Sequence, residues 1–478
     1  MISTQHRQNK NNNIMRKYYR LFVISILIAI ATNDAEAQVL SVMGEFSPST
    51  STLIGSASRI GFDNGPWSTY YMRYNDSSYF CDHHAYGYWA VWAPAVASTK
   101  VTMPQDFVIT DFKKFLNVPG YIGSCDGIGM YGYSLGYNLY NYNYFLIAKL
   151  PVLSQLNRIA EAHPSGSNAE MGMKFFSVGE KIESSYSTPR SYLLEFYYMG
   201  TNAYLYAPLA YNPQSNEFET ADDVITISQH VVFATRDTRS GYAPVNLRIS
   251  DTNNVLSYSS TIGYQWRFML PNYEIPLSEL RLLNLDDKEF VMAYTMLNTN
   301  NNNYYLCVHR INLPAFLANN NSIISHEIKI SRTCSNLIDM IYKPNAQTMV
   351  VLLDGEDGSM LFHLDPYSST NDIAVDLKYS SGHFYSIDTL GANGYLDDTL
   401  YIAMGGNVIF TQNISNGINI EASCLDMGKV KMLLREPPII KKEKDPLDFY
   451  SNNRFVFSTQ PIDEIFYGTR TCNKFIEN

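Results

Sequence analysis

The densest cluster of chemically reactive side chains in the sequence is the run Cys81-Asp82-His83-His84. Thiolate, imidazole and carboxylate groups are the usual ligands of transition metals. Neighbouring residues of a strand point to opposite faces, so His83 and His84 could bind one ion together only in a loop. We keep Asp82, His83 and His84 as weak metal candidates. The favoured interpretation is a polar turn after a buried cysteine, with no cofactor.

Paired acidic residues are a second candidate for chemistry. A glycosidase needs two carboxylates that face each other across a cleft, and the pairs Asp222-Asp223, Asp286-Asp287 and Asp397-Asp398 could supply them. Each pair lies in a predicted turn, where Asp is expected for conformational reasons. No catalytic residue is therefore assigned. A carbohydrate-active hydrolase or lyase with an active site in a central pocket is the alternative function.

The most unusual segment runs from residue 131 to 144 and contains six Tyr and three Asn. Tyr offers a flat apolar face and a hydroxyl group, and Asn offers two donors and an acceptor. This mixture suits stacking on sugar rings or contact with a protein surface. The alternative is a hairpin whose Tyr side chains pack on neighbouring strands. The predicted ligand-binding residues are Tyr131, Tyr133, Tyr137, Tyr140 and Tyr142.

These residues must be positioned by β-strands, because short runs rich in Val, Ile, Tyr and Phe alternate with Gly, Asn, Asp and Ser. The clearest hairpin joins residues 348–354 to 359–364 through the acidic turn 355–358. That turn lacks the ligand spacing of a calcium loop.

Seven such turns, near residues 76, 126, 200, 239, 301, 356 and 406, are about 55 residues apart on average, which fits four-stranded blades. The sequence predicts an all-β protein with a single β-propeller of six to eight blades, seven favoured. Two β-sandwich domains are the alternative.

Composition and charge restrict the partner. The 478 residues are 46% hydrophobic, 14% aromatic and 17% charged, which excludes a collagen-like chain, a coiled coil and a wholly disordered protein. The net charge of −10 and the lack of a long basic run argue against nucleic-acid binding. The expected partner is a glycan or a protein.

The N-terminal segment has the features of an export signal. Basic residues between 16 and 20 precede the apolar run 21–31, and Ala35-Glu36-Ala37 offers a cleavage site. An apolar run of about 11 residues is too short for a stable membrane anchor. We predict a signal peptide over residues 1–37, with Met15 as an alternative start, and no transmembrane anchor after cleavage. The expected localisation is periplasmic, cell-surface or secreted.

All six cysteines lie within the predicted domain 38–478 and allow fifteen pairings. Buried strand cysteines and disulfides both remain open. The first pair to test is Cys424 with Cys472, which would fix the C-terminal segment. Within residues 435–478 we expect an exposed charged connector around Lys441–Asp445, followed by a strand at 455–458 that pairs with residues 39–43 and closes the propeller.

Several runs resemble those of exported proteins from uncharacterised families of Gram-negative bacteria. The runs are Asp106-Phe-Val-Ile, Tyr121-Ile-Gly, Val245-Asn-Leu-Arg-Ile and Leu337-Ile-Asp-Met-Ile-Tyr. The resemblance rests on loose patterns spread over the mature chain, and it implies a propeller-like β fold without any activity. The leading hypothesis is therefore an exported, non-catalytic binding or scaffold protein that recognises a glycan or a protein surface.

Overall fold

The structure is a computed structural model, and it describes strands between Val39 and Phe475 together with the connections around the best-placed of them. Side chains are described for residues 220–236, 245–250, 265–318, 322–368, 382–388 and 423–442, and for some positions within 110–195 and 403–414. The predicted signal peptide lies outside the described residues.

Consecutive strands pair antiparallel in groups of four. The first groups are β2 (Thr52–Ile60), β3 (Pro66–Tyr74), β4 (Ser77–His84) and β5 (Val96–Val101); β6 (Val108–Phe115), β7 (Val118–Cys125), β8 (Ile128–Ser134) and β9 (Phe145–Leu150); β10 (Gln155–Ala162), β11 (Lys174–Ile182), β12 (Pro189–Tyr197) and β13 (Asn202–Pro208); and β14 (Glu219–Ile227), β15 (His230–Asp237), β16 (Val245–Asp251) and β17 (Thr261–Met269).

The next group begins with two short strands that share one partner, because β18 and β19 both pair with β20. The remaining strands are β18 (Glu274–Pro276), β19 (Arg281–Asn284), β20 (Glu289–Asn298), β21 (Asn303–Asn312) and β22 (Ile323–Ile330); β23 (Asn336–Lys343), β24 (Thr348–Asp354), β25 (Ser359–Leu364) and β26 (Ile373–Tyr379); and β27 (Ser386–Thr389), β28 (Leu400–Gly405) and β29 (Val408–Asn413), whose outer partner is β1 (Val39–Ser47). The described helices are α3 (Leu313–Leu317) and the 3-10 turn η2 (Pro344–Ala346).

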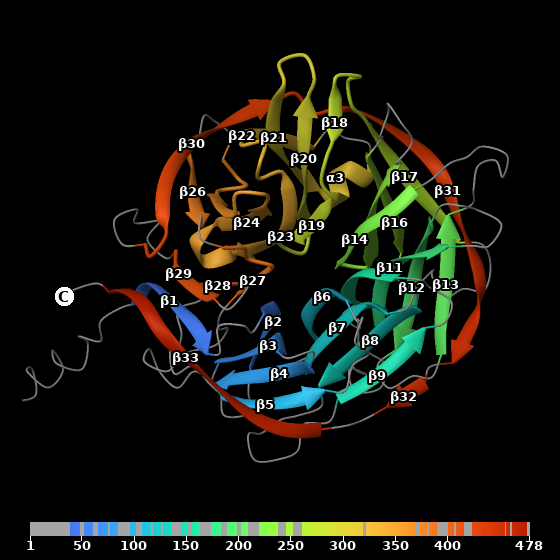
Figure 1. The fold of residues 1–478 in the computed structure, drawn as a ribbon. Helices are drawn as coiled ribbons and strands as arrows, with labels where there is room; N and C mark the ends of the chain where they lie inside the picture. Colours follow the sequence, from blue (N-terminus) through green and yellow to red (C-terminus); the bar gives the residue numbers. More distant parts are fainter. Residues whose placement is uncertain are drawn as a thin grey trace, which may run out of the picture.

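The groups are arranged around a common centre (Figure 1). The first strands of successive groups contact one another in the order β2, β6, β10, β14, β19, β23 and β27, and β27 contacts β2. A closed circle of sheets is the arrangement of a β-propeller. The all-β, propeller-like prediction is confirmed, and the alternative of two β-sandwich domains is wrong.

The hydrophobic core lies between neighbouring sheets. Trp266 and Phe268 of β17 pack on Phe316 of α3, at ring-centroid distances of 5.2 and 6.4 Å. Further clusters fill the spaces between β20–β22 and β23–β25 and between β23–β25 and β27–β29. The blades β14–β17, β18–β22 and β23–β26 are therefore each held by apolar side chains of both neighbouring blades.

A second layer of strands covers the outer edges of the blades. We call residues 426–475 the C-terminal belt; it runs around the perimeter in Figure 1, and its strands are β30 (Asp426–Arg435), β31 (Ile439–Arg454), β32 (Val456–Ser458) and β33 (Pro461–Phe475). β30 pairs with β26 and β22, and β31 pairs with β17 and β13. β32 pairs with β9, and β33 pairs with β5 and β1. Each long belt strand thus joins two neighbouring blades.

The belt corrects two expectations about the C-terminal segment. Lys441–Asp445 is part of β31 and pairs with Arg267–Gly263 of β17, so it is a strand and not a connector, although Lys441 and Lys442 are exposed. Residues 456–458 pair with β9, whereas β1 pairs with β29 and β33. Charges on an outer edge strand discourage pairing with other chains. This explains why Lys441–Asp445 is charged although it is part of a strand.

The seven predicted turns all join consecutive strands of one group. Six of them lie between the second and third strands, and the turn near residue 200 lies between β12 and β13. The acidic turn 355–358 contains Gly358 at φ 109°, and a Cβ on Gly355 would lie 1.5 Å from the Thr333 carbonyl oxygen. The turn is therefore a tight reversal packed against another loop. This agrees with the expectation that it is not a calcium-binding loop.

Candidate functional site at the propeller axis

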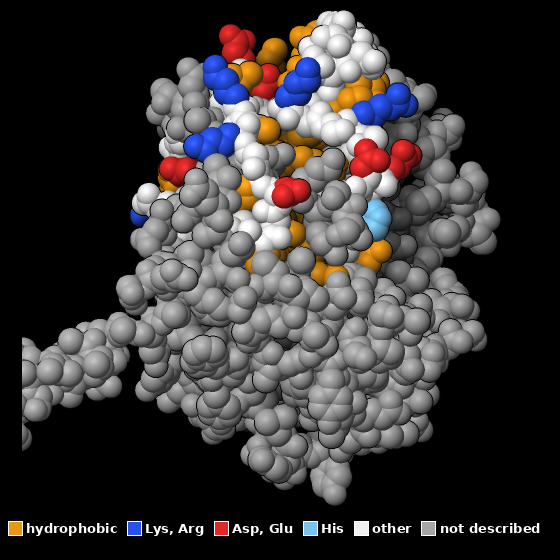
Figure 2. All heavy atoms as spheres, turned by 60° about the vertical axis from the view of Figure 1, so that its left-hand side comes forward, with side chains coloured by type: hydrophobic (Ala, Val, Ile, Leu, Met, Phe, Trp, Pro, Cys, Tyr) orange, Lys and Arg blue, Asp and Glu red, His pale blue; other side chains and the backbone are white. Residues whose placement is uncertain are grey.

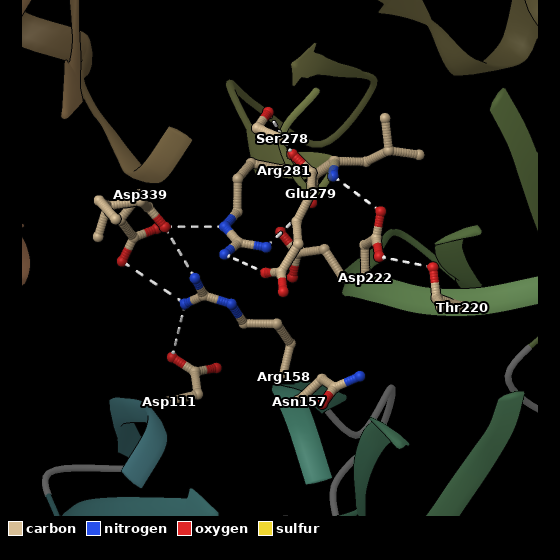
Figure 3. A network of polar contacts seen from close by, with 12 residues as sticks. Asp111, Asn157, Arg158, Thr220, Asp222, Ser278, Glu279, Arg281 and Asp339 are labelled. Atoms are coloured by element: carbon tan, nitrogen blue, oxygen red, sulfur yellow. Dashed lines mark hydrogen bonds and ion pairs between the residues drawn. The ribbon is translucent and has the colours of Figure 1, made fainter. Parts of the chain in front are cut away.

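Several innermost strands contain an irregularity next to a polar residue. The pairing register shifts just before Asp111 in β6, Arg158 in β10, Asp223 in β14 and Asp339 in β23. A β-bulge redirects the side chain that follows it. Asp111 and Asp339 consequently both face Arg158 (Figure 3).

Three carboxylates connect inner strands to their neighbours. Asp111 accepts a hydrogen bond from the backbone N–H of Ile159 at 3.0 Å. Asp222 and Asp223 accept from the N–H groups of Leu280 at 2.9 Å and Leu282 at 2.7 Å. Hydrogen bonds to a charged acceptor are stronger than neutral ones. The acidic residues therefore link β6 to β10 and β14 to β19.

Two arginines extend these links, Arg281 to the adjacent inner strand and Arg158 across the axis. Arg158 donates to Asp111 at 3.2 Å and to the Ile338 carbonyl at 2.8 Å, and its guanidinium lies 3.8 Å from Asp339. Arg281 donates to the same Ile338 carbonyl at 2.8 Å and to Glu279 at 2.6 Å. β10 and β23 are not neighbours in the circle of inner strands, so Arg158 spans the centre of the propeller.

The charges in this axial network are largely buried. Five carboxylates face three guanidinium groups, and only Glu279 is half exposed, at 52%. Burial raises the pKa of Asp222, although Arg236, its ion-pair partner, opposes this effect. The network consists of Asp111, Asp222, Asp223, Glu279, Asp339, Arg158, Arg236 and Arg281.

The pKa values of Arg158 and Glu279 are also shifted by charged neighbours in the network. Burial lowers the pKa of Arg158, but Asp111 and Asp339 outweigh it and raise the pKa on balance. Burial raises the pKa of Glu279, but Arg281 outweighs it and lowers the pKa on balance. Both groups therefore stay charged at neutral pH, and their ion pairs hold the inner strands together.

One of the three acidic pairs considered in the sequence belongs to the axial network. Asp222-Asp223 is buried in β14 and lies outside any turn, so its turn assignment is wrong. Asp286-Asp287 does lie in a turn, where Asp286 accepts from the N–H groups of Lys288 and Glu289, both at 2.7 Å. Asp397-Asp398 lies outside the described residues. The sequence does contain a signal for the network, because Asp recurs among the apolar residues near the start of a strand, as in Ala221-Asp-Asp-Val224 and Leu337-Ile-Asp-Met340.

The other predicted site residues lie in the first half of the chain. Tyr131 and Tyr133 belong to β8, while Tyr137, Tyr140 and Tyr142 lie outside the described residues, as do the side chains of all five. Asp82, His83 and His84 belong to β4, which pairs along its length with β3, so the expected polar turn is wrong. Their side chains are not described. Where side chains are described, no three His, Cys, Asp or Glu are grouped as a metal site requires.

Two overlapping motif matches at the start of the tyrosine-rich segment also escaped the sequence analysis. Gly127-Ile-Gly-Met-Tyr-Gly132 matches G-x-G-x-x-G, and Gly132-Tyr-Ser-Leu-Gly136 matches G-x-S-x-G. Both motifs function at a turn from a strand into a helix. Here residues 128–134 form β8, an antiparallel strand between β7 and β9. The strand context therefore supports neither a nucleotide loop nor a nucleophile elbow.

The described cysteines are of two kinds. Cys307 and Cys334 are buried thiols, and burial raises the pKa of Cys307 to about 12. Cys424 is disulfide-bonded, and its partner is among the residues whose side chains are not described. Cys472 lies in β33, and its pairing with Cys424 stays a prediction.

A second polar cluster lies inside the β20–β22 sheet. His309 Nδ1 lies 2.8 Å from the Ser325 hydroxyl and Nε2 lies 3.2 Å from the Tyr294 hydroxyl. Burial, with a smaller contribution from Arg435, lowers the pKa of His309 to about 3. All three side chains are shielded from solvent. The combination of Ser and His is therefore a structural hydrogen-bond chain that a substrate does not reach.

No family model and no curated protein matches the chain. Two similar solved structures are of Sqt1 from Chaetomium thermophilum. One, bound to the N-terminus of the ribosomal protein L10, has 9% identity and a TM-score of 0.37 over 77% of this chain and 98% of that chain. The other has 10% identity and a TM-score of 0.35 over 80% and 99%.

The comparison gives no support to the predicted exported localisation, because the similar Sqt1 chain is bound to part of a ribosomal protein. At these TM-scores the likeness supports no statement about activity. Within the described residues, the structure contains no helix with the length and apolar character of a membrane span.

Proposed function

We propose that this chain is a seven-bladed β-propeller that acts as a non-catalytic, protein-binding scaffold. The strand groups that begin with β2, β6, β10, β14, β18/β19, β23 and β27 support the blade number. β1 supplies the outer strand of the last blade, so that both ends of the chain take part in closing the circle. A structure of the whole chain at near-atomic resolution tests the number directly.

The bridge that Arg158 forms between β6, β10 and β23 is the observation that carries the non-catalytic assignment. Enzymes need a concave pocket with convergent polar groups, and a propeller offers this pocket at its axis. Here the guanidinium of Arg158 bonds to β6 and, across the axis, to β23. The acidic residues that could form a glycosidase pair instead accept hydrogen bonds from backbone N–H groups. Binding through the outer surface and the loops is the function that this geometry favours.

A hydrolysis assay with the full chain tests the assignment against the carbohydrate-active alternative. We expect no release of reducing sugar from a panel of plant and bacterial polysaccharides. The matched variants are Asp223→Asn in the axial network and Asp286→Asn in the exposed turn. Sugar release that Asp223→Asn abolishes and Asp286→Asn preserves would overturn the proposal, provided that circular dichroism shows both variants folded.

A further inference from the structure

The first half of the C-terminal belt has an outer surface of unusual composition. We call the exposed side chains of Lys429, Lys431, Leu433, Leu434, Ile439 and Lys441 the belt strip. Leu434 is 50% exposed, and Ile439, at 73%, is the most exposed large hydrophobic side chain of the described residues. Figure 2 views the side of β30, where hydrophobic side chains lie between Lys and Arg side chains and a smaller number of Asp and Glu side chains.

Protection of the sheet edge explains only part of this composition. Lysines along an outer strand deter pairing with other chains, so Lys429, Lys431 and Lys441 are expected in a belt. Leu434 and Ile439 do not protect the sheet edge, and they contribute little to the core because they are largely exposed. Apolar side chains grouped on a surface and bordered by polar ones mark an interaction site.

The charge of the belt strip is opposite to that of the chain. The whole chain has a net charge of −10, whereas the exposed charged side chains of residues 426–442 are four lysines and two acidic residues, Asp426 and Glu436, which gives this segment a net charge of +2. Exposed Lys329 lies next to it, because Ile328 pairs with Met432. Lys442 places its charge above the Trp266 ring, at 5.2 Å from its centroid. A local basic field on an acidic protein attracts negative groups of a partner and favours their correct orientation.

The apolar residues of the belt strip favour an acidic polypeptide over a nucleic acid as the partner. Nucleic acids are held by many phosphate contacts and by bases stacked on aromatic rings, and the strip contains no aromatic residue. Combined apolar and cationic groups instead match a polypeptide with both side-chain types. We propose that the belt strip binds an acidic, amphipathic segment of a partner protein. This inference rests on the proposed protein-binding function and names its partner.

The order of residues along the belt defines the shape of that segment. Leu434 and Ile439 are five residues apart, which places them within about 18 Å of each other, and lysines precede and follow them. A matching segment has apolar residues at its centre and carboxylates towards both ends. An extended peptide of about twelve residues spans the distance between Lys431 and Lys441.

Fluorescence anisotropy with the full chain tests this match. The probe is a labelled peptide of about twelve residues with a Leu/Ile centre and Glu at both ends. One control peptide has Lys in place of Glu, and a second has Ser in place of Leu/Ile. We expect binding of the probe alone, weakened by high salt because the charges are exposed.

Variants of the protein locate the binding. Lys431→Glu/Lys441→Glu and Leu434→Ser/Ile439→Ser should each weaken binding of the probe by about tenfold or more. Lys288→Glu is the matched control, because Lys288 is exposed in the turn between β19 and β20, and it should bind as the unchanged protein does. Unchanged melting temperatures confirm that the variants fold.

Three outcomes overturn the belt strip as a binding site. They are no binding of the probe up to about 1 mM, a low-affinity limit, equal binding of the peptide with the Ser centre, and tighter binding of a single-stranded oligonucleotide or of phosphatidylserine vesicles. None of these affects the scaffold assignment, which fails only if the hydrolysis assay detects activity. The two proposals can therefore fail separately.

Discussion

At the scale of single residues, His309 shows how burial fixes a charge state. Its folded pKa is about 3, below the ordinary value of 6.5, because burial disfavours the imidazolium ion. The unfolded chain therefore binds a proton that the folded chain does not between pH 6.5 and 3. The stability from neutral His309 is complete above pH 6.5 and is lost as the pH falls towards 3.

His309→Gln should consequently reduce the acid sensitivity of the protein. From the two pKa values, we expect His309 to destabilise the fold by about 2 kcal/mol at pH 5 relative to pH 8. Urea denaturation at both pH values measures this difference. A parallel loss of stability in His309→Gln and in the unchanged protein would refute the assignment of the loss to this side chain.

Gly355 illustrates a purely steric requirement. A Cβ at this position would lie 1.5 Å from the Thr333 carbonyl oxygen, which belongs to the backbone and cannot turn away. Gly355→Ala should therefore destabilise the protein by about 3 kcal/mol, at the upper end of the cost of overpacking. Thermal denaturation is the measurement, and Glu356→Ala, at the exposed neighbouring position, should leave the midpoint unchanged.

At the scale of elements, Arg435 anchors the belt to the inner part of a blade. Its guanidinium donates to Glu274 of β18 at 2.7 Å and contacts the Cys307 sulfur at 3.1 Å. Both members of the ion pair are about nine-tenths buried. Loss of one member leaves a buried charge without its counterpart, which is costlier than loss of the pair.

Arg435→Met should therefore destabilise the fold by about 3 kcal/mol, and adding Glu274→Gln should recover part of this loss. Denaturant unfolding of both single variants and the double variant forms a double-mutant cycle. Additive effects in that cycle would mean that the two side chains do not stabilise one another. Proteolysis near residue 423 provides a second readout, because a released β30 would be cleaved faster.

The elements also show what the sequence could and could not predict. The hairpin at 348–364 was predictable because Gly355 and Gly358 mark the reversal locally. The strand around Lys441–Asp445 was not, since its partner β17 lies far away in the sequence and its charges resemble those of a loop. The axial network escaped for a similar reason: a bulge at Asp223 interrupts the alternation on which strand prediction depends.

At the scale of the whole molecule, the belt accounts for a large part of the contacts between blades. A truncation at Lys444 removes one strand partner each from β13, β9, β5 and β1. Uncovered strand edges pair readily with other chains. We expect the truncated protein to melt at a lower temperature and to aggregate, as measured by calorimetry and size-exclusion chromatography. A monomer that melts within about 2 °C of the full protein would contradict a role of the belt in closure.

The position of the belt at the end of the chain has a consequence for biosynthesis. A ribosome makes β1–β29 before any belt strand. The outer edges of the blades therefore stay without their belt partners during most of translation. β1 in particular is the first described strand to emerge, yet its neighbours β29 and β33 are among the last. Such long-range pairing makes folding slow, and incomplete chains with open strand edges are prone to aggregate. The nascent chain should therefore depend on chaperones until its final strand has been released.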